Sequence, residues 1–292
     1  MIKQHYLENS YNLLVRKTFK DDFFKIRMEK KIPSPEISVV MPVYNEEKFL
    51  DESIQSILNQ TFKDFEFIII NDASIDNSLK IIKKYKDKRI KLINNKKNQG
   101  FSNSTNFGLR VAKGKYIANL CADDISHSKR LEKQFNYLEK NLHIFLVGSS
   151  AIYIDENGEE IRRFRKYDDY EMLAWRLPKS CSIIHPSIMF HNKGFFYDKF
   201  FRGATDYNFY LNLLTKGKNL TNLPEFLIKY RVHKGAMSVY NKKEQEFFAN
   251  EARRKNIFKG KFKLKFLFKL FSHHIKTRGE KKIVAKKDSL KE

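Results

Sequence analysis

The sequence has few of the residues on which several classes of protein depend. Its 292 residues include two cysteines, Cys121 and Cys181, which is too few for a disulfide framework and fits a reducing cytoplasm. No apolar run approaches the ~20 residues that a membrane-spanning helix needs. The first ten residues also lack the apolar core of a secretory signal. We therefore expect a cytoplasmic globular protein, in agreement with 41% hydrophobic and 31% charged residues.

Acidic residues are scarce relative to basic ones. The chain has 57 Lys and Arg against 34 Asp and Glu, a formal net charge of +23. Such an excess indicates an anionic partner, which composition alone leaves open among nucleic acid, an anionic membrane surface and a phosphorylated substrate. The sequence contains no RRM, zinc-finger or helix-turn-helix signature, so no nucleic-acid partner is expected. HExxH, CxxC, P-loop and GxSxG motifs are also absent, which argues against zinc hydrolases, kinases and serine hydrolases.

The pattern of apolar residues predicts an α/β fold. Short β-branched runs at 37–41, 65–70, 90–93 and 116–120 alternate with helical periodicity at 46–60, 76–85 and 102–112. This alternation predicts a mostly parallel sheet flanked by helices. Further along we expect a helix at 130–140, strands at 144–148 and 182–190, and a helix at 206–216. An Asp-Glu-Asn-Gly sequence between 151–154 and 160–164 predicts a hairpin.

Composition divides the chain into three parts. Residues 1–36 form a charged and predominantly helical extension that ends at two prolines, Pro33 and Pro35. Residues 37–238 hold the alternating strands and helices. From 239 to 292 the chain is strongly basic and forms a second extension.

Carboxylates follow the predicted strands, where α/β sheets bind their ligands. Asp72 follows the second strand, Asp123 and Asp124 follow the fourth, and Asp206 opens a later helix. Such carboxylates can accept hydrogen bonds from a ribose or a base, or hold Mg²⁺ or Mn²⁺. Taken singly, each could equally form a turn or cap a helix.

Six short motifs follow one another between residues 37 and 124. They read ISVVMPVYNEE (37–47), SILNQTF (56–62), NDASID (71–76), NQG (98–100), AKGKYI (112–117) and ADD (122–124). In order and spacing they resemble the family 2 glycosyltransferases, densely as far as residue 149 and more thinly to about 238. The resemblance implies a Rossmann-like GT-A domain with a nucleotide-binding half, 37–125, and an acceptor-binding half, 126–238. It also implies an inverting enzyme that uses a nucleotide-diphospho-sugar.

The resemblance assigns roles to residues on the donor side. Pro42, Val43 and Tyr44 correspond to a base pocket, and Asp72 to a partner of the uracil or its ribose. Asp123 corresponds to a ribose and metal ligand and Asp124 to a second metal ligand. Glu46 corresponds to a position near the nucleotide, although a charge–dipole role at the start of a helix fits equally well.

On the acceptor side, Asp206 resembles the catalytic base that takes the proton from the acceptor hydroxyl. His185, Arg231 and His233 resemble contacts to the acceptor or the diphosphate, with a structural role as the alternative for the histidines. The chain departs from the family pattern at Thr205, where a second carboxylate is common, and at Cys121, where many relatives have Asp. Thiols bind hard cations poorly. We therefore expect Asp123 and Asp124 to suffice, with Cys121 as a buried strand residue. A catalytically silent relative that binds a nucleotide or glycan is the first alternative, and a basic nucleic-acid-binding protein is the second.

The basic segment 258–271 alternates phenylalanine and leucine with lysine. At helical spacing the apolar side chains share one face beside a stripe of lysines, as in helices that lie on membranes. A helix packed on the catalytic domain, or a strand over 261–266, are alternatives. We expect the enzyme to lie at the inner face of the cell membrane and to act on a glycan or lipid-linked acceptor, in lipopolysaccharide, capsule or other surface polysaccharide synthesis.

Overall fold

The computed structural model describes residues 34–165, 169–236 and 242–258. Most of the predicted N-terminal extension and nearly all of the predicted basic helix at 258–271 lie outside this part. None of the described helices is both long and apolar enough to cross a bilayer.

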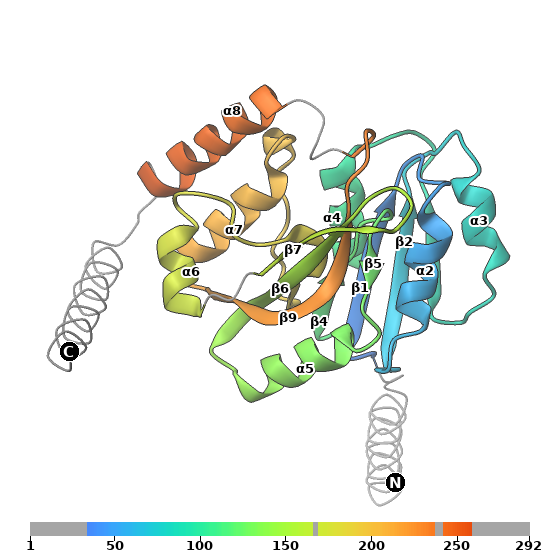
Figure 1. Ribbon diagram of the computed structural model, residues 1–292, viewed down its shortest axis with the longest axis horizontal. Helices are drawn as coiled ribbons and strands as arrows, with labels where there is room; N and C mark the ends of the chain where they lie inside the picture. Colours follow the sequence, from blue (N-terminus) through green and yellow to red (C-terminus); the bar gives the residue numbers. More distant parts are fainter. Residues whose placement is uncertain (1–33, 166–168, 237–241, 259–292) are drawn as a thin grey trace, which may run out of the picture. The chain divides into compact units, whose positions relative to one another are not determined.

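Four parallel strands form the first half of the sheet (Figure 1). They pair in the order β3-β2-β1-β4 and comprise β1 (Ile37–Val43), β2 (Phe65–Asn71), β3 (Ile90–Asn94) and β4 (Tyr116–Asn119). The side chains of β2 and β4 are buried throughout, as expected of strands covered by helices on both faces. The predicted α/β class is therefore confirmed.

Strand β1 continues through Pro42, where the sequence predicts its end. In a parallel strand, alternate residues direct their backbone groups to opposite neighbours. The carbonyl of Val43 points to the β2 side and accepts from Asp72 N at 2.8 Å. The carbonyl of Val40 points to the β4 side and accepts from Leu120 N at 3.2 Å. Pro42 therefore faces the β4 side, where the pairing has already ended at Val40 and Asn119. No strand there requires the N–H that proline lacks.

The second half of the sheet mixes parallel and antiparallel pairs. Its order continues from β4 as β8-β6-β9-β5, with β7 paired to β6. The strands are β5 (Ile125–Ser126), β6 (Ile144–Ile154), β7 (Glu160–Phe164), β8 (Met189–His191) and β9 (Asn219–Arg231). The β6–β7 pair confirms the predicted hairpin.

Several details of this half differ from the prediction. The strands expected at 144–148 and 151–154 are one continuous strand, β6. The expected strand at 182–190 is irregular up to a 3₁₀ turn, η1 (His185–Ser187), and becomes a strand only at β8. Strand β9 was not predicted, because Pro224 interrupts its apolar pattern. In the structure the β6–β9 register shifts at that point, so the proline lies at a bulge where it removes no ladder hydrogen bond.

Helices cover both faces of the sheet, each with its own apolar core. One core packs α2 (Leu50–Leu58), α3 (Ser78–Lys84) and α5 (Arg130–Lys140) against the sheet. The other core packs α4 (Phe101–Val111), α6 (Tyr170–Arg176), α7 (Thr205–Thr215) and α8 (Lys242–Arg253).

Helix α8 is the described portion of the predicted C-terminal extension. It packs on the same core as α7, with Phe248 and Ala252 buried, and continues into a π-helical turn, η3 (Arg254–Phe258).

Candidate functional site

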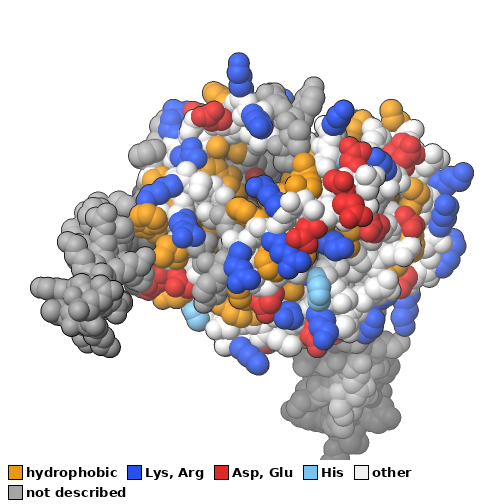
Figure 2. Space-filling model, in the orientation of Figure 1, with side chains coloured by type: hydrophobic (Ala, Val, Ile, Leu, Met, Phe, Trp, Pro, Cys, Tyr) orange, Lys and Arg blue, Asp and Glu red, His pale blue; other side chains and the backbone are white. Residues whose placement is uncertain are grey.

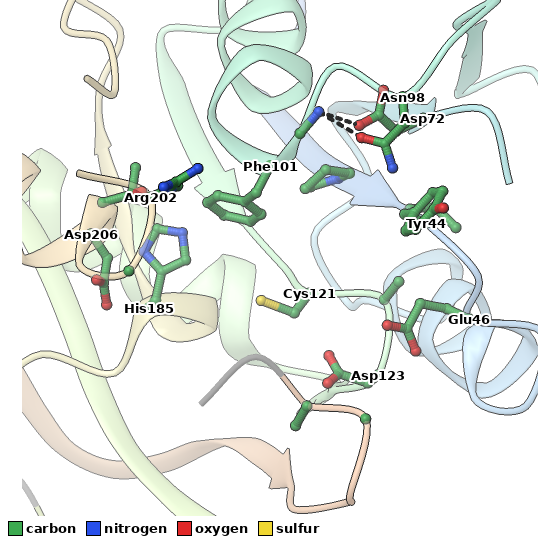
Figure 3. Close-up of a pocket in the computed structure, with 18 of the residues that line it drawn as sticks. Tyr44, Glu46, Asp72, Asn98, Phe101, Cys121, Asp123, His185, Arg202 and Asp206 are labelled. Carbon is green, nitrogen blue, oxygen red and sulfur yellow. Dashed lines mark hydrogen bonds between the residues drawn. The ribbon is translucent and has the colours of Figure 1, made fainter. Parts of the chain in front are cut away.

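A cavity of about 500 Å³ opens beyond the carboxyl ends of β1, β2 and β4, between α4 and the start of α7 (Figure 3). Residues from both halves of the sequence line it. Those predicted from sequence are Pro42, Val43, Tyr44, Glu46, Asp72, Asp123, His185 and Asp206. The remaining predicted residues, Asp124, Arg231 and His233, do not line it and lie behind the loop that carries Asp123.

Two of the sequence motifs form one wall of the cavity by bonding to each other. Asn45 accepts a hydrogen bond from Ile75 N at 2.9 Å and donates its own N–H to Ser74 Oγ at 3.1 Å. Asn45 and Ala73 both have positive φ, 57° and 59°, so each loop turns sharply after its strand. The paired loops hold Tyr44 at the cavity with 45% of its surface exposed.

Asp72 is buried at the same wall and organises the NQG motif. One carboxylate oxygen accepts from Gln99 N at 2.9 Å and Asn95 Nδ2 at 2.8 Å. The other accepts from Gly100 N at 2.9 Å, and Gly100 has φ +81°, which favours glycine. Asp72 therefore fixes the loop that leads into α4 and still borders the cavity (Figure 3).

Asp123, Asp124 and Cys121 form a compact group, in which Asp123 and Cys121 line the cavity and Asp124 lies behind them. Their potential ligand atoms lie within 4.8 Å of one another. Asp124 is 1% exposed; its Oδ1 accepts from Arg231 N at 2.8 Å, while its Oδ2 has no hydrogen-bond partner among the described residues. Burial, and then the charge of Asp123, raise the pKa of Asp124. A buried carboxylate oxygen without a donor is what a bound cation would stabilise, so this pair of carboxylates fits a divalent metal ion.

Cys121 lies beyond the end of β4 and lines the cavity, so the expectation that it belongs to the strand is wrong. Its side chain is partly buried. Burial, together with the charges of Asp124 and Asp123, raises the pKa of its thiol. The thiol is therefore protonated at neutral pH. A protonated thiol is a poor ligand for an oxygen-preferring cation.

Arg231 supports the floor from behind. Its guanidinium, 2% exposed, donates to the carbonyl of Asp123 at 2.9 Å and to Glu52 Oε2 at 2.6 Å, and lies 4.6 Å from the ring of Phe49. Two further donations go to the backbone of the β6–β7 hairpin. Arg231 therefore holds the acidic loop in place.

His233 and Glu46 are the titratable neighbours of Asp123. His233 Nε2 lies 3.1 Å from Asp123 Oδ2, and this hydrogen bond raises the pKa of His233. Burial, followed by the charge of Asp123, raises the pKa of Glu46 to about 7. Acidic charge is therefore concentrated here, which favours cations.

Asp206 reaches the cavity from the first turn of α7 (Figure 3). The N-cap of this helix is Ala204, so the alternative that Asp206 is a helix cap is wrong. Its Oδ1 accepts from Tyr207 N at 2.7 Å. Thr205, beside Asp206, is the position where the chain lacks the second carboxylate of the family pattern. It is buried, and its hydroxyl donates to Phe201 O at 2.8 Å.

His185 borders the cavity next to Asp206. Its Nδ1 lies 2.9 Å from the hydroxyl of Tyr210, and its Nε2 lies 3.3 Å from Asn119 Nδ2. Burial lowers the pKa of His185. The imidazole is therefore neutral at pH 7, and both ring nitrogens are engaged by the surrounding side chains.

Further cavity residues were not predicted from the sequence, among them Phe101, Arg202 and Gln245. Arg202 is 77% exposed and pairs with Glu244 at 3.2 Å. Arg202 belongs to none of the sequence motifs, so its place at the cavity could not be predicted from them. Gln245 belongs to α8, in a segment whose composition indicated only a basic extension.

Comparisons with known proteins agree with this architecture. The model of the family described as Glycosyl transferase family 2 matches residues 38–198. An uncharacterized glycosyltransferase of Methanocaldococcus jannaschii is 42% identical over 214 residues, 70% of this chain and 73% of that protein. The O-antigen biosynthesis glycosyltransferase WbnJ of Escherichia coli is 35% identical over 217 residues, 70% of this chain and 84% of that protein.

Solved structures share the fold at low sequence identity. S. aureus TarS 1–349 in complex with UDP aligns with a TM-score of 0.61 and 18% identity, covering 77% of this chain and 66% of TarS 1–349. The mannosyltransferase PcManGT from Pyrobaculum calidifontis, in complex with GDP-Man and Mn²⁺, aligns with a TM-score of 0.56 and 18% identity, covering 70% of this chain and 59% of that one. The chain thus spans somewhat less than two thirds of these proteins. Together with the family match, the fold and the curated relatives show that this chain belongs to glycosyl transferase family 2.

Proposed function

We propose that this enzyme transfers a hexose or N-acetylhexosamine from a UDP-sugar to a hydroxyl of a glycan or lipid-linked acceptor, with inversion, in the synthesis of a surface polysaccharide. One observation carries the proposal: two carboxylates, Asp123 and Asp206, line a single cavity, and Asp124 lies directly behind Asp123 in a metal-compatible pair. The O-antigen role in the name of WbnJ, and the TarS complexes with UDP and UDP-GlcNAc, support this choice of donor and pathway.

The donor nucleotide would lie against the wall built by the two paired loops. Tyr44 offers an exposed aromatic face to the base, with Pro42 and Val43 beside it. Asp72 borders the same space, and the lone pairs that its backbone donors leave free can accept from the base or ribose.

Asp123 and Asp124 would hold Mg²⁺ or Mn²⁺. The Oδ2 atom of Asp124 has no hydrogen-bond partner among the described residues, so it can coordinate the ion. When bound, the ion supplies positive charge against the charge that develops on the departing nucleoside diphosphate. The backbone N–H of Arg231 donates to Asp124 Oδ1 and so keeps the other carboxylate oxygen of Asp124 free for the ion. His233 orients Asp123 from the other side.

Asp206 would act as the general base. The acceptor oxygen attacks the anomeric carbon, the bond from that carbon to the diphosphate oxygen breaks, and the hydroxyl proton passes to Asp206. Attack from the face opposite the leaving group inverts the configuration. No other acidic residue occupies the first turn of α7, so the base role falls to Asp206 alone in this helix.

We also propose that residues 37–125 serve the donor and residues 126–238 the acceptor, with 1–36 and 239–292 as extensions. His185 and Arg202 lie on the acceptor side of the cavity, next to Asp206 (Figure 3). The basic segment 258–271 is proposed to hold the enzyme at the inner face of the cell membrane.

The proposal is tested by measuring release of nucleoside diphosphate from UDP-, GDP- and dTDP-sugars, with Mn²⁺, with Mg²⁺ and with a chelator. Asp206→Asn should reduce turnover at least about a hundredfold and leave UDP affinity nearly unchanged, because a base acts on the transition state. Asp64→Asn, an exposed aspartate outside the cavity, is the matched control and should turn over normally. Normal turnover by Asp206→Asn would refute its role. UDP binding without turnover in any condition would favour the silent relative.

A further inference from the structure

Two phenylalanine side chains are exposed next to the mouth of the cavity. Phe200, in the 3₁₀ turn η2 (Lys199–Phe201), is 58% exposed, and Phe247, in α8, is 57% exposed. The ring centroids of both lie close to that of buried Phe248, at 5.8 and 5.3 Å. A Cβ added at Gly203, which lines the cavity, would lie 3.0 Å from the Phe248 ring. The aromatic cluster therefore adjoins the cavity wall.

Cations surround this pair. Lys199, Lys242 and Lys243 are exposed on the same two elements, and Arg202 reaches from η2 into the cavity rim. We name these four cations, with Phe200 and Phe247, the rim patch. Figure 2 shows hydrophobic side chains lying beside Lys and Arg side chains over the region of α6, α7 and α8.

The acidic residues of α8 offset part of this charge. Glu244 pairs with Arg202, and Glu251 pairs with Arg254. Glu246 is exposed beside Phe247, so the three lysines of the patch outnumber the remaining carboxylate. Directly after the described part of α8 and η3, the sequence 259–292 carries twelve Lys or Arg and three Asp or Glu. The rim patch is therefore continuous in sequence with the most basic part of the chain.

Exposed aromatic rings flanked by lysines match the chemistry of an anionic lipid surface. Phenylalanine partitions into the boundary between headgroups and acyl chains, while lysine and arginine extend to the phosphates. A single exposed phenylalanine is ordinary on a protein surface, whereas two that share one buried neighbour form a patch. Charge complementarity thus favours an anionic bilayer over a neutral protein surface.

We propose that the rim patch docks the mouth of the cavity on an anionic lipid bilayer. This assigns membrane contact to the catalytic domain itself, in addition to the basic segment 258–271. It also sets the side of the cavity from which a lipid-linked acceptor enters. That last point rests on the proposed function, whereas docking is measured without turnover.

The test places a reporter in the patch of the full-length chain. Trp175→Phe removes the only tryptophan, and Phe247→Trp then introduces one at the rim. Vesicles of phosphatidylglycerol with brominated acyl chains should quench its fluorescence, and phosphatidylcholine vesicles should not. The control is Leu142→Trp in the same background, because Leu142 is 76% exposed after α5, which packs in the other core. Co-sedimentation without quenching at position 247 would assign binding to the basic segment alone and overturn the proposal.

A second measurement removes the apolar contact. The double variant Phe200→Ser/Phe247→Ser should bind phosphatidylglycerol vesicles about tenfold more weakly than wild type. Leu142→Ser/Ile161→Ser removes two exposed aliphatic side chains elsewhere and should not. Unchanged far-UV circular dichroism and UDP affinity check folding. A double variant that loses self-association and keeps its lipid affinity would make the patch a contact between copies, and the lipid assignment would be wrong. UDP-sugar hydrolysis in solution tests the proposed function separately.

Discussion

Arg130 is fully buried beneath the cavity, and removing its guanidinium should destabilise the protein strongly. It donates from Nη2 to Asn119 O at 2.7 Å, from Nη1 to Pro186 O at 2.8 Å and from Nε to Gln134 Oε1 at 3.1 Å. Burial lowers the pKa of Arg130 to about 9. It thereby connects the end of β4, which leads to Cys121, with the turn that carries His185.

The magnitude follows from the three acceptors that Arg130→Met leaves without a donor. Each hydrogen bond from a charged donor contributes about 1.5–3 kcal/mol, and relief of the cation's desolvation returns a large part of the sum. We expect a loss of about 3 kcal/mol, which corresponds to a fall in Tm of about 6–12 °C for a domain of this size. Arg130→Lys should cost a similar amount, because one ammonium group cannot span three acceptors.

Urea unfolding followed by circular dichroism measures this loss. Arg110→Met is the control, since Arg110 is exposed on α4 and lies over the ring of Phe196. The control should change the free energy of unfolding by less than about 1 kcal/mol. Equal midpoints for Arg130→Met and wild type would refute the assignment of Arg130 as a structural link between the two sides of the site.

Two further predictions concern the buried network under the AKGKYI motif. Burial would raise the pKa of Glu66, but hydrogen bonds from Lys91, Ser38 and the backbone outweigh burial and lower the pKa. Glu66→Gln should therefore reduce the free energy of unfolding by about 1–2 kcal/mol at pH 7. Urea unfolding should show the full difference between wild type and variant at pH values above the ordinary carboxyl pKa. The difference should disappear as the pH falls through the lowered pKa of Glu66 in the folded protein. A difference that does not change with pH would contradict this explanation. Gly114→Ala should cost at least about 2 kcal/mol, because the new Cβ would lie 2.6 Å from Ile37 C. Thermal unfolding measures it, and an unchanged Tm would show that the turn can move.

Much of the donor side was predictable because it is local. The parallel type of the strands and the position of the ligand-binding edge follow from runs such as Phe65–Asn71 and from the rule that ligands bind beyond parallel strands. The strand order came from the structure. Asp72 was found because it directly follows such a strand, and Asp123 because it lies in the loop that follows β4. The cavity lining includes both.

The functions of individual motif residues were not predictable from the pattern. Gln60 binds Leu131 N and His127 O, which ties the end of α2 to the chain after Asp124. Gly114 N donates to Ser38 Oγ at 2.8 Å, so its motif is structural. Sequence spacing could not distinguish these residues from ligand contacts.

By itself the sequence determined the family, the α/β class and the carboxylates that follow strands, because these depend on residues close together in the chain. Only the tertiary structure decided which side chains share the cavity. It placed Arg231 behind the acidic loop as a support, placed Asp206 inside the first turn of α7 instead of at its N-cap, and brought Arg202 and Gln245 to the rim. The physical reason is that burial, charge coupling and hydrogen-bond partners depend on segments far apart in sequence, which meet only when the two halves of the sheet and α8 pack together.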